Sequence, residues 1–420
     1  MTTATDRQST AALEHNLRWL SAWWILRWSF LGEAVWVIYL IEVRGLTLGE
    51  VLLFEAAFQA VTLLAQVPTG ILADRYGRRP ILIAASLSWA VAFVAFGLAE
   101  TFLALFGSYL WFALGMALMS GADDAMLFDT LRALGRGEEF ARRSGRLSGL
   151  ATATAAGFGL TGGLLARWWP LAWLMVASGA ISVVAALLAW RLREPPREVR
   201  TRTFFATGRS ALRRVWNRPA LLWAIAVVAV VQVAVEVIFV VSQPVLVAAG
   251  APVWSLGGFT AAILLGSTLG GLEAGGLLSR LGFARALGFI APLAILALAG
   301  AAGQRLWLFP LMLAAPFAWN VLFPLLSDYL SRRVPDDERA TTLSISQAVV
   351  QVGGITATLA LGLAIDRGGT QPALAATSVC LLALAGFTYW RWHRSGDREI
   401  EPAGARYDAV PHDEEHHDQR

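Results

Sequence analysis

The sequence predicts an all-α integral membrane protein in which twelve transmembrane helices form two pseudo-symmetric six-helix bundles. Three observations predict this fold class: an apolar composition, an alternating distribution of arginine and an internal repeat. Of the 420 residues, 56% are hydrophobic and 15% are charged. A soluble protein of this length cannot bury so much apolar surface, so we expect most of the chain to lie in a lipid bilayer.

Apolar segments long enough to cross a bilayer recur along the chain, separated by short polar connections. A transmembrane helix needs about 20 predominantly apolar residues, and most of these segments meet that length. The expected spans are residues 19–41, 47–73, 79–99, 102–128, 146–168, 170–190, 219–249, 254–279, 284–303, 306–328, 342–365 and 371–392.

Arginines gather in every second connection. They are dense at 75–79, 132–146 and 191–218, whereas the connections between these mostly hold one arginine each. Cytoplasmic loops carry the excess of basic residues, so both termini are expected in the cytoplasm and the protein in the inner cell membrane. The basic charge therefore indicates membrane orientation and not a nucleic-acid partner.

The arginine-rich stretch 191–218 divides the chain. It contains two prolines and few apolar runs, which is typical of a linker. We therefore expect an N-terminal six-helix bundle at 1–190 and a C-terminal one at 219–394. The polar, acidic tail 395–420 is expected to be disordered.

An internal repeat with an offset of about 200 residues supports two related halves. Segment 70–77 aligns with segment 275–282, and both end in glycine. Segment 33–37 aligns with 236–240, and each copy begins with a glutamate.

The loop between the second and third spans carries the most specific motif. Residues 70–79 read G-I-L-A-D-R-Y-G-R-R, with Gly77 permitting a tight turn. This segment resembles the signature loop of major facilitator superfamily transporters, and within that family the chain resembles the bacterial drug-efflux-like group. The resemblance implies a secondary transporter that works by alternating access. It also implies that Asp74 and Arg78 form a charge network with Asp129.

In the resembled family this network latches the cytoplasmic side while the transporter is open to the outside. Carried over to this chain, the latch consists of Gly70, Asp74, Arg75, Gly77, Arg78 and Asp129. The resemblance implies a conformational role for these residues rather than substrate binding.

Acidic residues inside the spans are the main candidates for chemistry, because a charge at membrane depth is costly. Glu33 in the first span and Glu236 in the seventh are equivalent in the repeat. Gln232, Phe239 and Gln243 share the helical face of Glu236. Desolvation favours the neutral form of a carboxyl group, so such a site suits a cation that competes with a proton.

Trp36 lies on the same face as Glu33 and adds an aromatic surface for a cation. The alternative for Glu33 is a structural acid that is either paired with Arg27 or capped by a neighbouring helix. Asp123 and Asp124 are adjacent in the fourth span and point about 100° apart. We expect Asp124 to face the cavity and the other acid to pair with an arginine near the cytoplasm.

Polar stripes follow one face of the second and the eleventh span. They consist of Glu55, Gln59, Thr62 and Gln66, and of Ser344, Gln347, Gln351 and Thr358. In a membrane such stripes face protein or water, so they either join helices or line the cavity. Gln347 and Gln351 are included in the predicted substrate and proton site.

These features predict proton-coupled efflux of a small amphipathic or cationic compound by a monomeric antiporter. The alternative is a proton-coupled uptake symporter for a neutral solute, which glutamines of the cavity would bind. A non-transporting membrane sensor is a third class. No phosphate-binding loop is present, which argues against an ATP-driven pump and an enzyme. We expect no cofactor and no metal, because an ion gradient would drive transport.

Overall fold

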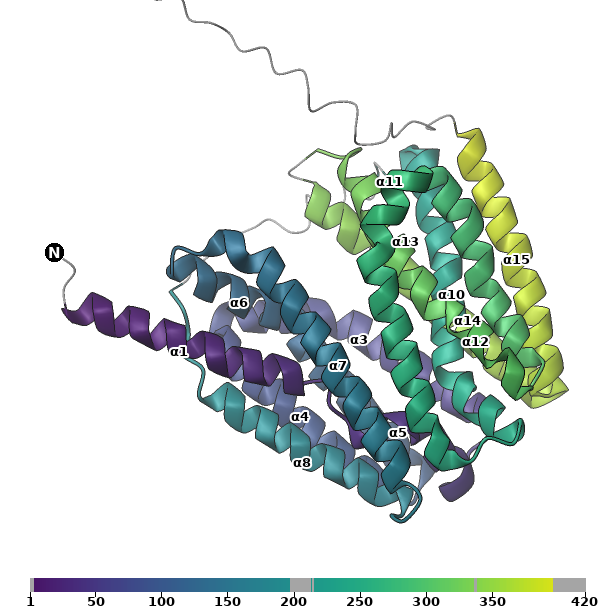
Figure 1. Ribbon diagram of the computed structural model, residues 1–420, viewed down its shortest axis with the longest axis horizontal. Coiled ribbons are helices and arrows are strands. Elements are labelled where there is room, and N and C mark those ends of the chain that lie inside the picture. Colours follow the sequence, from purple (N-terminus) through teal and green to yellow (C-terminus); the bar gives the residue numbers. More distant parts are fainter. Residues whose placement is uncertain (1–3, 197–212, 214, 336–337, 396–420) are drawn as a thin grey trace, which may run out of the picture.

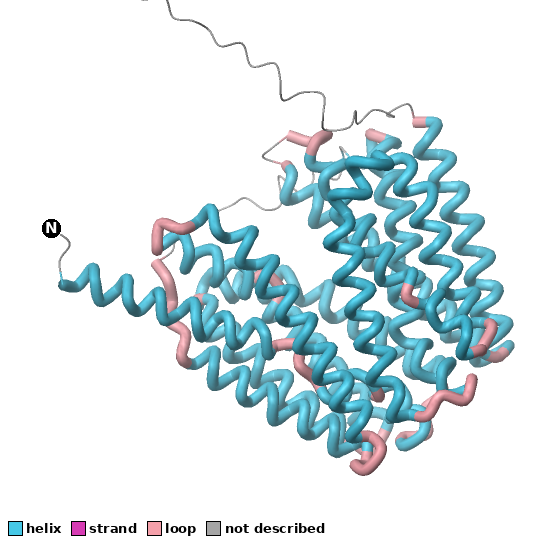
Figure 2. Tube along the Cα trace, in the orientation of Figure 1, coloured by secondary structure: helices cyan, strands magenta, loops and turns pink. Residues whose placement is uncertain are grey.

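The computed structural model describes residues 4–196, 213, 215–335 and 338–395. Every regular element in this part of the chain is a helix (Figures 1 and 2). Most of the predicted linker and the predicted tail lie outside the described residues. The helices form two groups, one before and one after the linker.

The first group starts with α1 (Ala4–Leu26), which is followed by three short elements: η1 (Leu31–Ala34), α2 (Trp36–Ile38) and η2 (Tyr39–Val43). Its other elements are α3 (Leu48–Tyr76), α4 (Arg78–Leu98), α5 (Phe102–Met119), α6 (Ala122–Ala133), η3 (Gly137–Glu139), α7 (Phe140–Leu165) and α8 (Leu171–Trp190).

The second group starts with the long helix α10 (Pro219–Ala248). It continues with η4 (Val253–Ser255), α11 (Leu256–Ala302), η5 (Leu306–Leu308), α12 (Phe309–Met312), α13 (Ala314–Ser331), α14 (Arg339–Gly368) and α15 (Thr370–Arg394). Buried apolar side chains pack within each group and also where the two groups meet.

Among the described residues, ten helices are long and apolar enough to span a membrane, and a bent pair in the first span makes eleven. Helix α7 occupies the place of the predicted fifth span and completes the pattern of twelve. It is less apolar than the helices counted above, because its N-terminal part carries arginines and the rest is rich in glycine and threonine. The predicted fold class is therefore confirmed.

Three predicted boundaries need correction. The first span is not one helix over 19–41, because the chain bends by 44° between Ala34 and Trp36. The fourth span extends from Phe102 to Ala133 and is interrupted at Gly121, whose φ is 78°. The eighth and ninth spans meet directly at Gly282, whose φ of 71° makes the turn.

Local sequence explains the main helix boundaries. Thr47 and Glu50 form a capping box at the start of α3, in which each side chain bonds the backbone N–H of the other. Gly77 ends α3 with a φ of 102°, a conformation that costs a glycine little. Gly282 aligns with Gly77 in the repeat and has the same left-handed type of conformation, which explains why both copies end in glycine.

The two groups meet at the end of the molecule where α7 ends and α8 begins, which we call the far end. The opposite end, where α8 ends and α10 begins, is the linker end. At the far end a Cβ on Gly163 would lie 2.6 Å from the Cα of Gly257, and one on Gly362 would lie 3.2 Å from the carbonyl oxygen of Gly49. These glycines allow α7 to pack on α11 and α3 on α14. Toward the linker end the two groups diverge (Figure 1).

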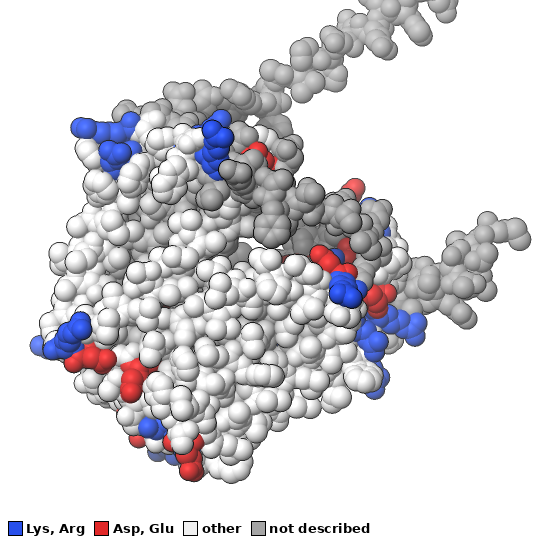
Figure 3. Space-filling model, turned by 180° about the vertical axis from the view of Figure 1, so that it is seen from behind, with Lys and Arg blue, Asp and Glu red and all other residues white. Residues whose placement is uncertain are grey.

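Charged side chains gather near the two ends, and a broad uncharged surface separates them (Figure 3). Tryptophans flank this surface: Trp168 and Trp173 are exposed near the far end, and Trp190 and Trp216 near the linker end. Tryptophan is enriched where a membrane meets water. The chain is a multi-pass membrane protein.

Candidate functional site

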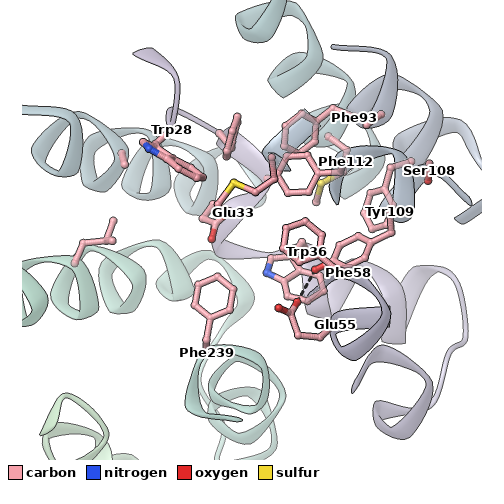
Figure 4. Close-up of a pocket in the computed structure, with 18 of the residues that line it drawn as sticks. Trp28, Glu33, Trp36, Glu55, Phe58, Phe93, Ser108, Tyr109, Phe112 and Phe239 are labelled. Carbon is pink, nitrogen blue, oxygen red and sulfur yellow. Dashed lines mark hydrogen bonds between the residues drawn. The ribbon is translucent and has the colours of Figure 1, made fainter. Parts of the chain in front are cut away.

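A cavity of about 320 Å³ lies where the two groups of helices meet (Figure 4). Its lining is dominated by aromatic rings, which come mostly from the first group. They are Trp28, Phe30, Trp36, Phe58, Phe93, Phe96, Tyr109, Phe112 and Phe239. Two carboxyl groups, those of Glu33 and Glu55, reach this lining, and none of the described residues that line it is basic.

The break in the first span brings Glu33 to the cavity. Glu33 lies in η1, a short 3-10 turn between two helical segments. The hydroxyl of Ser178 accepts a hydrogen bond from the Gly32 N–H at 3.1 Å. A Cβ on Gly162 would collide with the carbonyl oxygen of Leu31. Small residues of α7 and a serine of α8 therefore hold this turn against the first group.

Glu55 belongs to a chain of hydrogen bonds that crosses from one group to the other. The Tyr109 hydroxyl donates to Glu55 at 2.8 Å, and Gln59 donates to the other oxygen of Glu55 at 3.4 Å. The same Gln59 nitrogen donates to Glu236 of α10 at 2.5 Å, and Gln232 donates to the second oxygen of Glu236 at 2.5 Å. One buried carboxamide thus links two carboxyl groups from opposite groups of helices.

The structure brings part of the predicted substrate site together. Glu33, Trp36 and Phe239 line the cavity, and the Trp36 ring stacks on Tyr109 with centroids 5.6 Å apart. Glu236 and Gln232 lie outside this lining and connect to it through Gln59.

The remaining predicted residues are placed elsewhere. Gln243 is buried and bonds the backbone of the first span. Gln351 donates to the carbonyl oxygen of Gln59 at 3.3 Å, while Gln347 is exposed. Asp124 is exposed and lies outside the cavity lining, where its carboxyl group accepts a hydrogen bond from Ser144 at 3.3 Å.

Arg27 does not pair with Glu33, so the ion-pair form of the structural alternative is wrong. Its guanidinium forms an ion pair with Asp123 and lies 4.1 Å from the centroid of the Trp24 ring. Asp123 thus pairs with an arginine of the first span, whereas an arginine near the cytoplasm was expected. A buried guanidinium needs such a partner because its charge is otherwise uncompensated.

The signature loop forms a second charged cluster, at the linker end. Arg78 donates to Asp129 at 2.8 Å, as the resemblance implied. Asp74 and Arg75 are exposed, and the Arg75 guanidinium lies 5.4 Å from the Tyr76 ring centroid. Gly70 has open space around it, since no atom lies within 4 Å of where its Cβ would stand.

Glu194 is a member of this cluster that sequence reasoning missed. Its carboxylate accepts the backbone N–H groups of Arg78 at 2.7 Å and Arg79 at 2.9 Å, at the start of α4. A carboxylate is favourable there because the N–H groups and the helix dipole both attract negative charge. The signal was weak, because Glu194 lies more than 100 residues from the loop.

Sequence reasoning also missed most of the cavity wall. Tyr109 is the one hydroxyl-bearing ring in the predicted fourth span, and its hydroxyl in an apolar helix could have been noticed. The phenylalanines gave no signal, because phenylalanine is common in every membrane span.

Comparisons with known proteins agree with this architecture. The chain matches the family model of the Major Facilitator Superfamily over residues 25–358. Among solved structures, a point mutant of the nucleoside transporter NupG is similar at 13% identity with a TM-score of 0.78, covering 90% of this chain and 99% of that one.

Two further structures are similar. A bacterial homologue of the human lysosomal transporter Spinster, in an inward-facing and unoccupied conformation, has 18% identity and a TM-score of 0.70, covering 93% of this chain and 99% of that one. A D-xylose–proton symporter has 14% identity and a TM-score of 0.65, covering 90% of this chain and 96% of that one. No curated protein matches the chain in sequence. At these identities the structural likeness shows the fold alone.

Proposed function

We propose a specific transport function from the premise that the chain belongs to the major facilitator superfamily, a family of transporters. The protein exports small amphipathic cations in exchange for protons. The observation that carries this proposal is the cavity, whose described lining combines aromatic rings with the carboxyl groups of Glu33 and Glu55 and contains no basic side chain.

The aromatic lining selects for a lipophilic cation. A cation over the face of an aromatic ring is attracted by the ring quadrupole, with roughly 2 kcal/mol gained when the contact is desolvated. Trp36, Tyr109 and Phe239 offer such faces next to Glu33. A carboxylate then supplies the opposite charge that a desolvated cation requires.

The three glutamates at the meeting of the halves supply the exchange with protons. Glu55 and Glu236 share the Gln59 carboxamide, and two carboxylates this close disfavour full ionisation of both. A bound proton relieves this repulsion, and an arriving cation replaces the proton. Export and proton entry therefore exclude one another at the same group of acids, which is the requirement of an antiporter.

The uptake alternative is less well supported by the same geometry. A neutral polar solute needs hydrogen-bonding groups, yet Gln232, Gln243 and Gln351 bond protein atoms and Gln347 is exposed. None of these four glutamines lines the cavity.

We infer that the linker end faces the cytoplasm, in agreement with the arginine distribution. The described conformation is then closed at the far end and open toward the cytoplasm. In this state Asp74 is exposed while Arg78 and Asp129 remain paired within the first group, which fits a latch that engages only when the linker end closes. We further propose that the protein is a monomer in the inner cell membrane, with the two bundles at 1–190 and 219–394.

The test is an accumulation assay in a bacterial host stripped of its own efflux pumps. Cells that express the protein should accumulate less tetraphenylphosphonium than cells with an empty vector, and an uncoupler should abolish the difference. Glu33→Gln should restore accumulation, whereas Glu42→Gln, an exposed acid at the end of the same span, should not. Unchanged accumulation across a panel of lipophilic cations would contradict the export proposal.

A further inference from the structure

The bend in the first span contains a side chain from the other group of helices. In an uninterrupted α-helix, the N–H of Val37 would donate to the carbonyl oxygen of Glu33, four residues earlier. In this structure the Val37 N–H donates to Oε1 of Gln243 at 3.1 Å, and Nε2 of Gln243 donates to the Glu33 carbonyl oxygen at 3.1 Å. The carboxamide therefore occupies the place of one helical hydrogen bond.

The first span bends by 44° at this point. A side chain that inserts into the ladder of helical hydrogen bonds is an established cause of a kink. Residues 31–37 read L-G-E-A-V-W-V and contain no proline. The backbone is also irregular on both sides of the bend, with an extended Phe30 before η1 and the π-helical turn η2 after α2. Gln243 lies in α10 and is only 4% exposed, so its carboxamide depends on these two bonds for its partners.

The inserted group crosses the boundary between the two halves near the far end, where the halves are closed. The same boundary contains the close approaches of Gly163 to Gly257 and of Gly362 to Gly49. Separation of the halves at this end would withdraw Gln243 together with α10. The Glu33 carbonyl and the Val37 N–H would then be free to bond each other.

We propose that Gln243 is a positioning residue that converts closure of the far end into the bend of the first span, and that this bend holds Glu33 at the cavity. Opening of the far end straightens the segment and turns Glu33 relative to the aromatic wall. The link between Gln243 and the bend does not depend on what the protein transports. Its effect on cation binding rests on the proposed function.

The first measurement concerns the bend. Spin labels at Arg18→Cys and Glu42→Cys, both exposed positions on either side of it, would be placed in a Cys380→Ser background, since Cys380 is exposed. Pulsed electron paramagnetic resonance would measure the distance between the labels, both with Gln243 in place and in the Gln243→Leu variant. For two straight arms with an α-helical rise of about 1.5 Å per residue, loss of the 44° bend would lengthen the label distance by about 2–3 Å. Gln371→Leu, which removes an exposed glutamine of the same half, should leave the distance unchanged.

The second measurement concerns Glu33. Equilibrium binding of tetraphenylphosphonium to the purified protein should weaken roughly tenfold in Gln243→Leu and stay unchanged in Gln371→Leu. Gln243→Asn keeps the carboxamide but is one methylene shorter, so it should shift both quantities in the same direction. This variant decides the question if Gln243→Leu does not fold.

The outcomes separate the two claims. An unchanged label distance in a folded Gln243 variant would overturn the proposal, whatever happens to binding. A longer distance with unchanged affinity would overturn the positioning of Glu33. If the unmodified protein binds no tetraphenylphosphonium, the proposed function fails for this class of cation, and the label distance still decides whether Gln243 causes the bend.

Discussion

Two of the clusters of acidic residues in the described part of the chain differ in the partners of their carboxyl groups. At the meeting of the halves, Glu33, Glu55 and Glu236 are surrounded by aromatic rings, amides and a tyrosine hydroxyl. At the linker end, Asp129 and Glu139 each contact an arginine. In the first cluster the described partners of the acids carry no charge. In the second, Asp129 and Glu139 are paired with arginines, which balance their charge.

The difference indicates how a carboxyl group that binds a ligand differs from one that has a structural role. A carboxyl group whose charge is balanced by arginine gains nothing from a further cation or proton. A carboxyl group that is desolvated and held only by neutral donors is costly as an anion, and either a cation or a proton lowers that cost. Side-chain type alone therefore does not reveal function, whereas the partners of the side chain do.

The largest effect is expected for Glu236→Gln. This change removes one of the two carboxyl groups that share Gln59, so proton binding at the shared site should be lost. The new amide oxygen can still accept from Gln59, whereas Gln232 has to turn its carboxamide so that its oxygen accepts from the new amide N–H. Proton-driven transport of tetraphenylphosphonium in proteoliposomes should fall by roughly tenfold or more and lose its dependence on pH. A normal pH profile in this variant would remove Glu236 from the exchange.

Tyr109→Phe should have the next largest effect. The change deletes the hydroxyl that donates to Glu55 at 2.8 Å but keeps the ring that stacks on Trp36. Loss of a hydrogen bond to a charged group costs roughly 1.5–3 kcal/mol, so cation affinity and pH profile should both shift. Tyr389→Phe is the matched control, because that hydroxyl makes only a long 3.3 Å bond to a backbone oxygen. Equal effects of the two variants would argue against a role of Glu55 in the cavity.

Asp129→Asn tests the paired cluster. The Arg78–Asp129 pair is partly buried, and its loss should cost about 1 kcal/mol of stability and slow transport. Asp74→Asn should slow transport without a loss of stability, because Asp74 is exposed in this conformation. Thermal unfolding in detergent and transport rates would be measured together. Unchanged rates in both variants would contradict the latch.

The smallest effect is expected for Glu139→Gln. Hydrogen bonds from Arg136 at 2.8 Å and from Arg143 at 2.7 Å lower the pKa of this carboxyl group to about 2. A lowered pKa means that its contribution to stability is complete above about pH 4.3, the unperturbed value, and is lost only as the pH falls toward 2. The variant should therefore change neither the pH profile of transport nor its rate. A changed pH profile would extend the proton-binding site to this exposed loop.

The sequence predicted the fold well, because the length of the apolar segments and the gathering of arginines in every second connection do not depend on contacts between distant parts of the chain. Glycine at positions 77 and 282 predicted the repeated turn, and both adopt a positive φ. The bend near Glu33 could not be predicted, because its inserted group, Gln243, lies about 200 residues away. Asp124 was expected at the cavity and lies outside its lining, because a periodicity argument places a residue on a face but does not say what that face meets.

The sequence by itself determined that this is a membrane protein of two related halves, which of its acids lie at membrane depth, and which loop carries the signature. These follow from hydropathy, charge and spacing, which do not depend on contacts between distant segments. Only the tertiary structure decided which acids stay unpaired: Asp123 meets Arg27, whereas Glu55 and Glu236 meet the amide of Gln59. The physical reason is that the cost of a buried charge depends on its neighbours, and packing chooses those neighbours.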